Sequence, residues 1–137
     1  MNIDFGAINW LAIVVCVVVG QIFLTVWFVA LFAKPWARAY GVDDAKQHSK
    51  EIPGYTYGIG ALCVFLLSLG LAGLQQGLGV KTAVDGLVFG GYAAACLCVA
   101  TALPGYAFLK RWRAGALAIG SQAALIVILS LILALWK

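Results

Sequence analysis

Four apolar runs, each long enough to cross a bilayer, make up most of this 137-residue chain, and nearly every charged residue lies between them. The runs cover about residues 8–32, 55–74, 83–103 and 114–136. A helix of about 20 apolar residues spans the hydrocarbon core of a bilayer. The sequence therefore predicts an all-α, polytopic membrane protein in which four transmembrane helices form one antiparallel bundle, with residues 1–137 as a single domain.

Composition supports membrane insertion, because 64% of the residues are hydrophobic, only 10% are charged and the mean hydropathy is +1.03. Membrane β-strands alternate apolar and polar residues, whereas residues 11–19 and 123–135 form almost uninterrupted apolar sequence, which favours helices. The first run is too long for the apolar part of a signal peptide and has no basic segment before it. We therefore expect it to be retained as a membrane span.

Basic residues are concentrated in the first and third loops, seven against two on the opposite side. The seven are Lys34, Arg38, Lys46, Lys50, Lys110, Arg111 and Arg113, and the two are Lys81 and Lys137. This asymmetry favours a cytoplasmic position for the loop over about residues 33–54 and for the third loop. The sequence thus predicts a multi-pass protein of the bacterial inner (cytoplasmic) membrane with both termini outside, in the periplasm. The net charge of +4 would then face anionic lipids, and no nucleic-acid partner is expected.

The first loop holds most of the polar residues between the runs and predicts a short surface helix. Asp43 is the expected N-cap and Asp44 lies near the positive end of that helix, which continues to about Lys50 before Pro53 restarts the membrane segment. The helix is either a solvated connector or a docking element for a partner. His48, within it, is expected to be a solvent-exposed residue and not a catalytic base.

Small residues recur at every fourth position of the third run. This packing stripe consists of Gly86, Gly90, Ala94, Cys98 and Ala102. Weaker rows are Ala116, Gly120 and Ala124 in the fourth run, and the pairs Gly54/Gly58 and Gly73/Gly77 around the second. Such rows let a second helix approach closely in lipid. The third-run stripe therefore predicts either packing within the chain or an oligomer contact.

Four polar residues are candidates for a polar pathway or for contacts between helices, namely Gln21, Thr25, Asp85 and Gln122. An amide inside a membrane either bonds a neighbouring helix or coordinates a solute, and both interpretations stay open for the two glutamines. Asp85 follows Thr82 at the spacing of a capping box, with Asp in place of Glu. The alternative is a proton or cation site in an outer vestibule.

The sequence offers no recognisable catalytic, cofactor-binding or metal-binding residues. Its four cysteines, Cys16, Cys63, Cys96 and Cys98, all lie within apolar runs, and the chain has a single histidine. Metal sites and disulfide frameworks need clustered or suitably spaced ligands, so we expect neither, and we expect no cofactor and no enzymatic activity.

Several short elements along the chain together resemble a known family. They are Asn9-Trp10-Leu11, Trp27-Phe28, Leu31-Phe32, Lys34, Trp36, Gly41-Val42-Asp43, Asp85 and Leu135-Trp136. With them the chain resembles, along nearly its whole length, the bacterial membrane family known as domain of unknown function 1761. The chain departs from the family at Pro104-Gly105-Tyr106, where a more polar, Asn-Asn-Tyr-like sequence is expected. The resemblance implies a four-helix membrane domain and implies no activity.

Three hypotheses for function follow. The favoured one is a structural or accessory subunit of a larger membrane assembly. The second is a homo-oligomeric channel or transporter for a small solute, lined by the four polar candidates. The third is an enzyme similar to the trimeric membrane-associated glutathione enzymes, whose second helix carries Arg, Glu and Asn, whereas residues 55–74 are uncharged here. The expected partners are membrane lipids and either further copies of the chain or other membrane-protein subunits.

Overall fold

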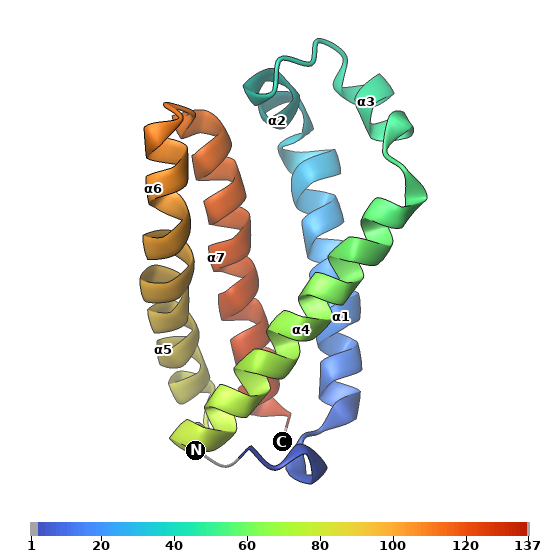
Figure 1. Ribbon diagram of the computed structural model, residues 1–137. Coiled ribbons are helices and arrows are strands. Elements are labelled where there is room, and N and C mark those ends of the chain that lie inside the picture. The colour runs from blue at the N-terminus through green and yellow to red at the C-terminus, as the bar shows by residue number, and fades with distance from the viewer. Residues whose placement is uncertain (1–2, 137) are drawn as a thin grey trace.

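The computed structural model describes residues 3–136, apart from the side chains of residues 45, 48 and 49, and contains helices but no strand in this range (Figure 1). The expectation for His48 therefore lies outside the described residues. The elements are a 3₁₀ turn Phe5–Ala7, α1 Trp10–Thr25, a π-helical segment Val26–Leu31, α2 Ala33–Ala39, α3 Ala45–Glu51, α4 Gly54–Leu78, α5 Ala83–Ala93, a π-helical segment Ala94–Val99, α6 Ala100–Phe108 and α7 Trp112–Leu135.

Four helices are long and apolar enough to cross a membrane. They are Trp10–Leu31, Gly54–Leu78, Ala83–Phe108 and Trp112–Leu135. The all-helical class and the four spans predicted from hydropathy are thus confirmed. A π-helical segment ends the first span and another interrupts the third, so each of these spans consists of more than one helical element.

The second span extends four residues beyond its predicted end at about residue 74. Gln75 and Gln76 lower the local hydropathy, but glutamine is a good helix former, so the helix continues. It ends at Gly79, which adopts a left-handed conformation with φ of +69°, while the N–H of Val80 bonds the carbonyl oxygen of Gln75 at 3.0 Å.

The third span also extends beyond its predicted end at about residue 103, through Pro104 to Phe108. Proline has no N–H for the helical ladder. The preceding turns are adapted to it: the Ala100 N–H bonds the carbonyl oxygen of Ala95 with π-helical spacing, and the Thr101 hydroxyl donates to the carbonyl oxygen of Leu97. Such adjustments make proline tolerable inside a membrane helix.

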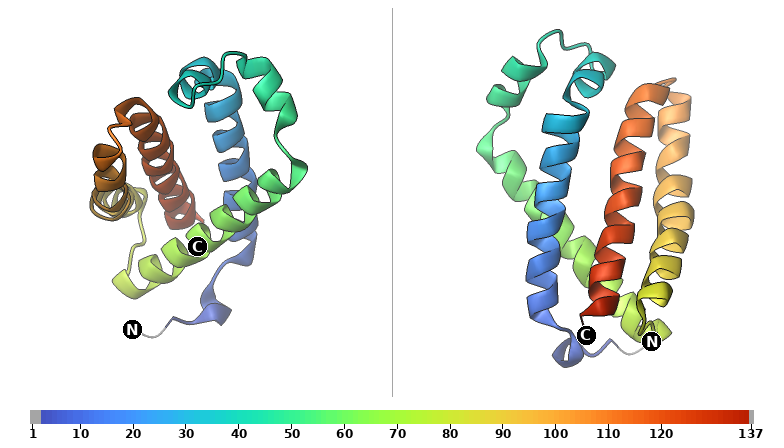
Figure 2. Two further views of the ribbon diagram at one scale, coloured as in Figure 1. Left: turned by 45° about the horizontal axis from the view of Figure 1, so that its top comes forward. Right: turned by 180° about the vertical axis from the view of Figure 1, so that it is seen from behind.

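The four spans run alternately up and down, and the molecule has two distinct ends (Figure 1). Both described chain ends lie together at the terminal end, whereas α2, α3 and the turn between α6 and α7 lie at the opposite, loop end. The span formed by α5 and α6 lies beside α7, while α4 crosses obliquely over α1 and α7 (Figure 2). The helices are therefore packed unevenly along their length.

The buried core lies mainly toward the terminal end and surrounds α7. Its fully buried side chains include Ile13, Cys16, Val64, Leu125 and Leu129. At the centre, a Cβ built on Gly20 of α1 would lie 2.6 Å from Val64 Cγ1 and 3.3 Å from Leu125 Cδ1. Glycine at this position thus lets α1, α4 and α7 meet. Toward the loop end packing thins, since no described residue of Val26–Leu31 or of α6 is buried.

The third-run stripe faces α7 at its first two members. A Cβ on Gly86 would lie 3.1 Å from the carbonyl oxygen of Ser130, and one on Gly90 would lie 3.0 Å from Val127 Cα. Ala94 is also buried, whereas Cys98 and Ala102 are half-buried. The terminal half of the stripe is therefore a close contact within the chain.

The weaker small-residue rows have mixed positions. Gly73 is buried beneath Ile3, and Gly120 lies against the indole of Trp27. Gly54 and Gly58 have no atom within 4 Å of a built Cβ. The remaining members, Gly77, Ala116 and Ala124, are exposed, exposed and half-buried respectively.

The surface helix α3 is capped one residue later than predicted. The carboxylate of Asp44, not that of Asp43, accepts hydrogen bonds from the N–H groups of Lys46 at 2.9 Å and Gln47 at 3.2 Å. Gly41, with φ of +74°, lies in the turn that follows α2, and Asp43 falls in the connection that leads away from it. The prediction of Asp43 as the cap was therefore wrong by one position.

Candidate functional site

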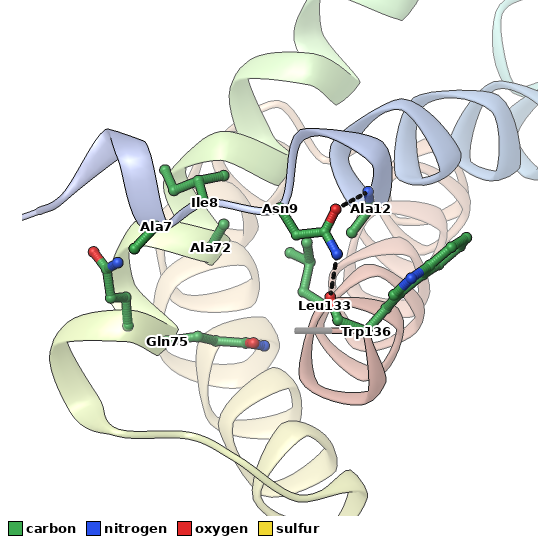
Figure 3. Close-up of a pocket in the computed structure, with 9 residues that line it drawn as sticks. Ala7, Ile8, Asn9, Ala12, Ala72, Gln75, Leu133 and Trp136 are labelled. Carbon is green, nitrogen blue, oxygen red and sulfur yellow. Dashed lines mark hydrogen bonds between the residues drawn. The ribbon is translucent and has the colours of Figure 1, made fainter.

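A pocket of about 110 Å³ lies at the terminal end, between the segment before α1, the last turns of α4 and the end of α7 (Figure 3). Polar and apolar groups from three distant parts of the sequence meet in this pocket, which makes it a candidate site. The lining residues are Ala7, Ile8, Asn9, Ala12, Ala72, Gln75, Gln76, Leu133 and Trp136.

Asn9 joins the start of the first span to the end of the last. Its side-chain oxygen accepts a hydrogen bond from the Ala12 N–H at 3.2 Å and so caps α1. Its amide nitrogen donates to the carbonyl oxygen of Trp136 at 3.4 Å (Figure 3). Capping fixes the direction in which the chain enters α1, and the second bond closes one wall of the pocket.

Gln76 holds the N-terminal segment over the end of α4. Its side-chain oxygen accepts from the Asp4 N–H at 2.9 Å, and its amide nitrogen donates to the Asp4 carbonyl oxygen at 3.2 Å. Ile3 packs on Gly73 directly beside this pair. The segment before α1 is thus fixed by two hydrogen bonds and an apolar contact.

Gln75 is the most deeply buried polar residue of the pocket, with 1% of its surface exposed. Gln75 lies on α4 in the pocket (Figure 3), and its amide nitrogen donates to the Ser130 carbonyl oxygen of α7 at 2.8 Å. Its side-chain oxygen and the Ser130 hydroxyl are buried without a protein partner. Buried polar atoms of this kind are costly unless a donor from water or from a ligand reaches them.

Gln75 was not among the predicted site residues, because hydropathy places the end of the second run one residue before it. A signal was present, since Val64, Ser68, Leu71 and Gln75 follow the i, i+4, i+7, i+11 spacing of one helix face. All four are buried. Extending the helix to the glycine that ends it places Gln75 on the inner face.

Two of the four polar candidates are neighbours on the first span. Gln21 is half-buried, and its side-chain oxygen would lie 3.3 Å from a Cβ built on Gly60 of α4. This oxygen is buried without a protein partner. The Thr25 hydroxyl donates to the backbone oxygen of Gln21 at 2.8 Å, so it is bound within its own helix.

Asp85 is not brought together with the other candidates, because it lies at the terminal end, at the start of α5. Its carboxylate accepts from the Thr82 N–H at 3.1 Å, and the Thr82 hydroxyl accepts from the Asp85 N–H at 3.1 Å. This is the capping box predicted from the sequence.

Gln122 lies on the inner face of α7 and is nevertheless exposed. It shares the i, i+4, i+7 spacing of one helix face with Ile126 and Leu129, which are 8% and 0% exposed. None of the described groups bonds its amide. The inner face of α7 is therefore covered at Leu129 and open at Gln122.

The two glutamines lie at a similar depth on different helices. Gln21 is the residue after Gly20, toward the loop end of the first span. Gln122 lies about one turn before Leu125 and therefore also toward the loop end, because α7 begins at that end. Since Gly20 and Leu125 belong to the three-helix contact, both amides lie just beyond it toward the loop end. The structure thus separates two polar zones, the pocket at Gln75 and the level of Gln21 and Gln122.

Among residues 3–136, side chains 45, 48 and 49 aside, no three His, Cys, Asp or Glu residues form a group that could hold a metal ion. The cysteines are free, with Cys16 buried, Cys98 half-buried, and Cys63 and Cys96 exposed. The polar side chains of the four candidates are two amides, a hydroxyl and a capping carboxylate, which bind through hydrogen bonds.

The fold and its four apolar spans define a small polytopic membrane protein. The chain belongs to the family described as "Protein of unknown function (DUF1761)", whose model matches residues 11–134. This confirms the family resemblance found in the sequence. No curated protein and no solved structure matches the chain.

Proposed function

We propose that the protein is an accessory subunit of a bacterial inner-membrane assembly and that it receives a transmembrane helix of a partner protein on the open inner face of α7. The observation that carries the proposal is the exposed amide of Gln122 on a face that is otherwise buried. The proposal includes no catalysis, since α4 carries no Arg, Lys, Asp or Glu over Gly54–Leu78.

The depth of Gln122 makes its exposure costly. It is the eleventh residue of the 24-residue helix α7, about 15 Å along the axis from Trp112 at a rise of about 1.5 Å per residue. An amide at this depth meets hydrocarbon unless protein covers it. A hydrogen bond between membrane helices contributes about 1 kcal/mol, which favours a partner helix over lipid at this position.

The surroundings of Gln122 also suit a helix. Ala118, one turn before it, is small and half-buried, whereas Gly115 on the same face is already covered by Tyr106 of this chain. Small residues let a second helix approach closely enough to reach the amide. We place the partner helix outside this chain because its four spans already pair with one another through α5, α7, α1 and α4.

Site-specific photocrosslinking in native membranes tests this proposal. A benzophenone amino acid at position 122 is expected to give a discrete protein adduct, and the same group at the lipid-exposed position of Leu62 on α4 is expected to give none. Gln122→Leu should reduce co-purification of the crosslinked protein, because it removes the hydrogen-bonding group.

Three outcomes would contradict the proposal. One is the absence of a protein adduct at position 122, and another is the same adduct from both positions. An adduct between two copies of this chain would replace the foreign partner by a homo-oligomer.

The similar depth of Gln21 and Gln122 supports a second candidate, a polar pathway in a homo-oligomer. The unpartnered side-chain oxygen of Gln21 is the group that would contact a solute. Solute flux in proteoliposomes that is lost with Gln21→Leu, while Thr25→Val keeps it, would support the pathway. A protein that remains monomeric in gentle detergent and conducts no solute would exclude it.

A further inference from the structure

A second cavity, of about 560 Å³, lies at the loop end between the first span, α2 and α3. We call it the lysine groove. One side is apolar and is formed by Val29, Ala30 and Leu31 of the π-helical segment that ends the first span. The other side carries Lys34 of α2 and Lys46 and Lys50 of α3. Figure 1 shows α3 close to α2 and the loop end of the first span.

The local structure explains how three lysines come together. Lys46 and Lys50 are four residues apart on α3 and therefore share one face of that helix. Lys34 lies in the first turn of α2, directly after the first span. The connection between α2 and α3 brings Lys34 near the face of α3 that carries Lys46 and Lys50, so all three lysines line the same groove.

The charge of the lysine groove is not balanced by acids within it. No carboxylate is among its lining residues, and none of the three ammonium groups forms an ion pair with a described carboxylate. Asp43 and Asp44 line an adjoining pocket together with Lys34 and Lys46. Asp44 caps α3, and the Glu51 carboxylate accepts a hydrogen bond from the Gln47 side chain at 3.0 Å. Three like charges beside one cavity favour an anionic ligand.

The apolar wall indicates which anion fits. Val29 and Leu31 are 37% and 64% exposed, and they continue the surface of a span that crosses the membrane. A soluble anion would gain no binding energy from this apolar wall. A phospholipid would place its acyl chain against the wall and its headgroup at the level of the lysines. Lysine side chains suit this boundary because their stems are apolar and their ends are charged.

We propose that the lysine groove binds an anionic phospholipid, with one acyl chain along Val29, Ala30 and Leu31 and the phosphate between Lys34, Lys46 and Lys50. The site places lipid at the level where basic clusters next to membrane helices bind acidic headgroups. It is independent of the open face of α7, since none of its residues belongs to α7.

The test is lipid binding to the purified full-length chain in detergent, followed by native mass spectrometry. The probes are phosphatidylglycerol and phosphatidylcholine with identical acyl chains. The wild type is expected to bind phosphatidylglycerol about 100-fold more tightly, since three lysines contribute about fivefold each. The triple variant Lys34→Gln/Lys46→Gln/Lys50→Gln is expected to lose this preference, because each lysine removed weakens the binding of phosphatidylglycerol by about fivefold.

The matched control is Lys110→Gln/Arg111→Gln/Arg113→Gln, which removes three positive charges from the same end of the molecule and leaves the lysine groove intact. It should keep the preference for phosphatidylglycerol. Helical content and elution volume of both triple variants are compared with the wild type, and Lys46→Gln/Lys50→Gln replaces the triple variant if that one does not fold.

Soluble glycerol phosphate distinguishes a lipid from a free phosphate and should not displace the bound lipid. Displacement by glycerol phosphate at similar concentration would show an anion site without a lipid component and overturn the proposal. Equal preference in the lysine variant and the wild type would also overturn it. Equal loss in both triple variants would mean a general charge effect and would do the same.

Discussion

At Gly90, a hydrogen atom is the only side chain that fits between α5 and α7. A Cβ at this position would lie 2.9 Å from Ser130 Cβ and 3.0 Å from Val127 Cα. Both are atoms at or next to the backbone, so they cannot swing aside as the end of a flexible side chain could. Glycine here sets the distance between the two helices.

Gly90→Leu is therefore expected to destabilise the protein by about 1–3 kcal/mol or to prevent folding, because the side chain overpacks a rigid contact. The measurement is thermal unfolding in detergent together with the size of the solubilised particle. Gly91→Leu is the matched control, since Gly91 is exposed and has no atom within 4 Å of a built Cβ. An identical melting temperature for Gly90→Leu and the wild type would show that α5 and α7 do not pack this closely.

At the residue scale, the sequence predicted which small residues recur but not which of them meet a partner. Gly86 and Gly90 face α7, whereas Cys98 and Ala102 of the same stripe are only half-buried. The spacing alone cannot separate them, because the distance between two helices changes along their length. For the same reason, the spacing of Gln122 places it on the inner face of α7 but does not predict that it is exposed there.

The N-terminus of α5 is formed by the capping box that its sequence predicts. The Thr82 hydroxyl and the Asp85 carboxylate each bond the backbone N–H of the other residue. The two bonds satisfy N–H groups that the first turn of a helix leaves without partners.

Thr82→Ala should therefore cost about 0.5–2 kcal/mol, with faster amide exchange confined to the first turn of α5. Thr82→Ser keeps the hydroxyl and should restore wild-type protection. Asp85→Asn keeps an acceptor oxygen and is expected to leave assembly unchanged. A complete loss of assembly in Asp85→Asn, with α5 still protected, would instead favour the proton or cation site.

Element boundaries were less predictable than element positions. Hydropathy falls at Gln75 and at Pro104, yet α4 and α6 continue past these residues. Hydropathy reports the preference of side chains for lipid, whereas a helix ends where its backbone changes conformation. Gly79 provides that change after α4, and Lys110, with φ of +55°, provides it after α6.

On the scale of the whole molecule, both basic loops lie at one end and both described chain ends at the other (Figure 2). The basic residues of the first and third loops therefore gather at one end of the protein, which is more positive than the other end. The positive-inside rule predicts that the loop end faces the cytoplasm.

Cysteine labelling in intact cells tests this orientation. A thiol introduced by Gln47→Cys should resist a membrane-impermeant maleimide until the membrane is permeabilised, and one introduced by Lys81→Cys should react directly. Both positions are exposed and lie at opposite ends of the molecule. Wild-type protein measures the background from the native cysteines. The reverse labelling pattern would contradict the predicted orientation.

The sequence by itself determined the number of spans, the helical class, the concentration of basic residues in two loops and the capping box of α5. These features follow from hydropathy, charge and hydrogen bonding over a few neighbouring residues, so they need no knowledge of distant contacts. Only the tertiary structure decided that Gln75 is buried against Ser130, that Gln122 is open and that Lys34 meets Lys46 and Lys50. Each of these depends on the distance between segments far apart in the chain, which is set by how the helices cross and pack.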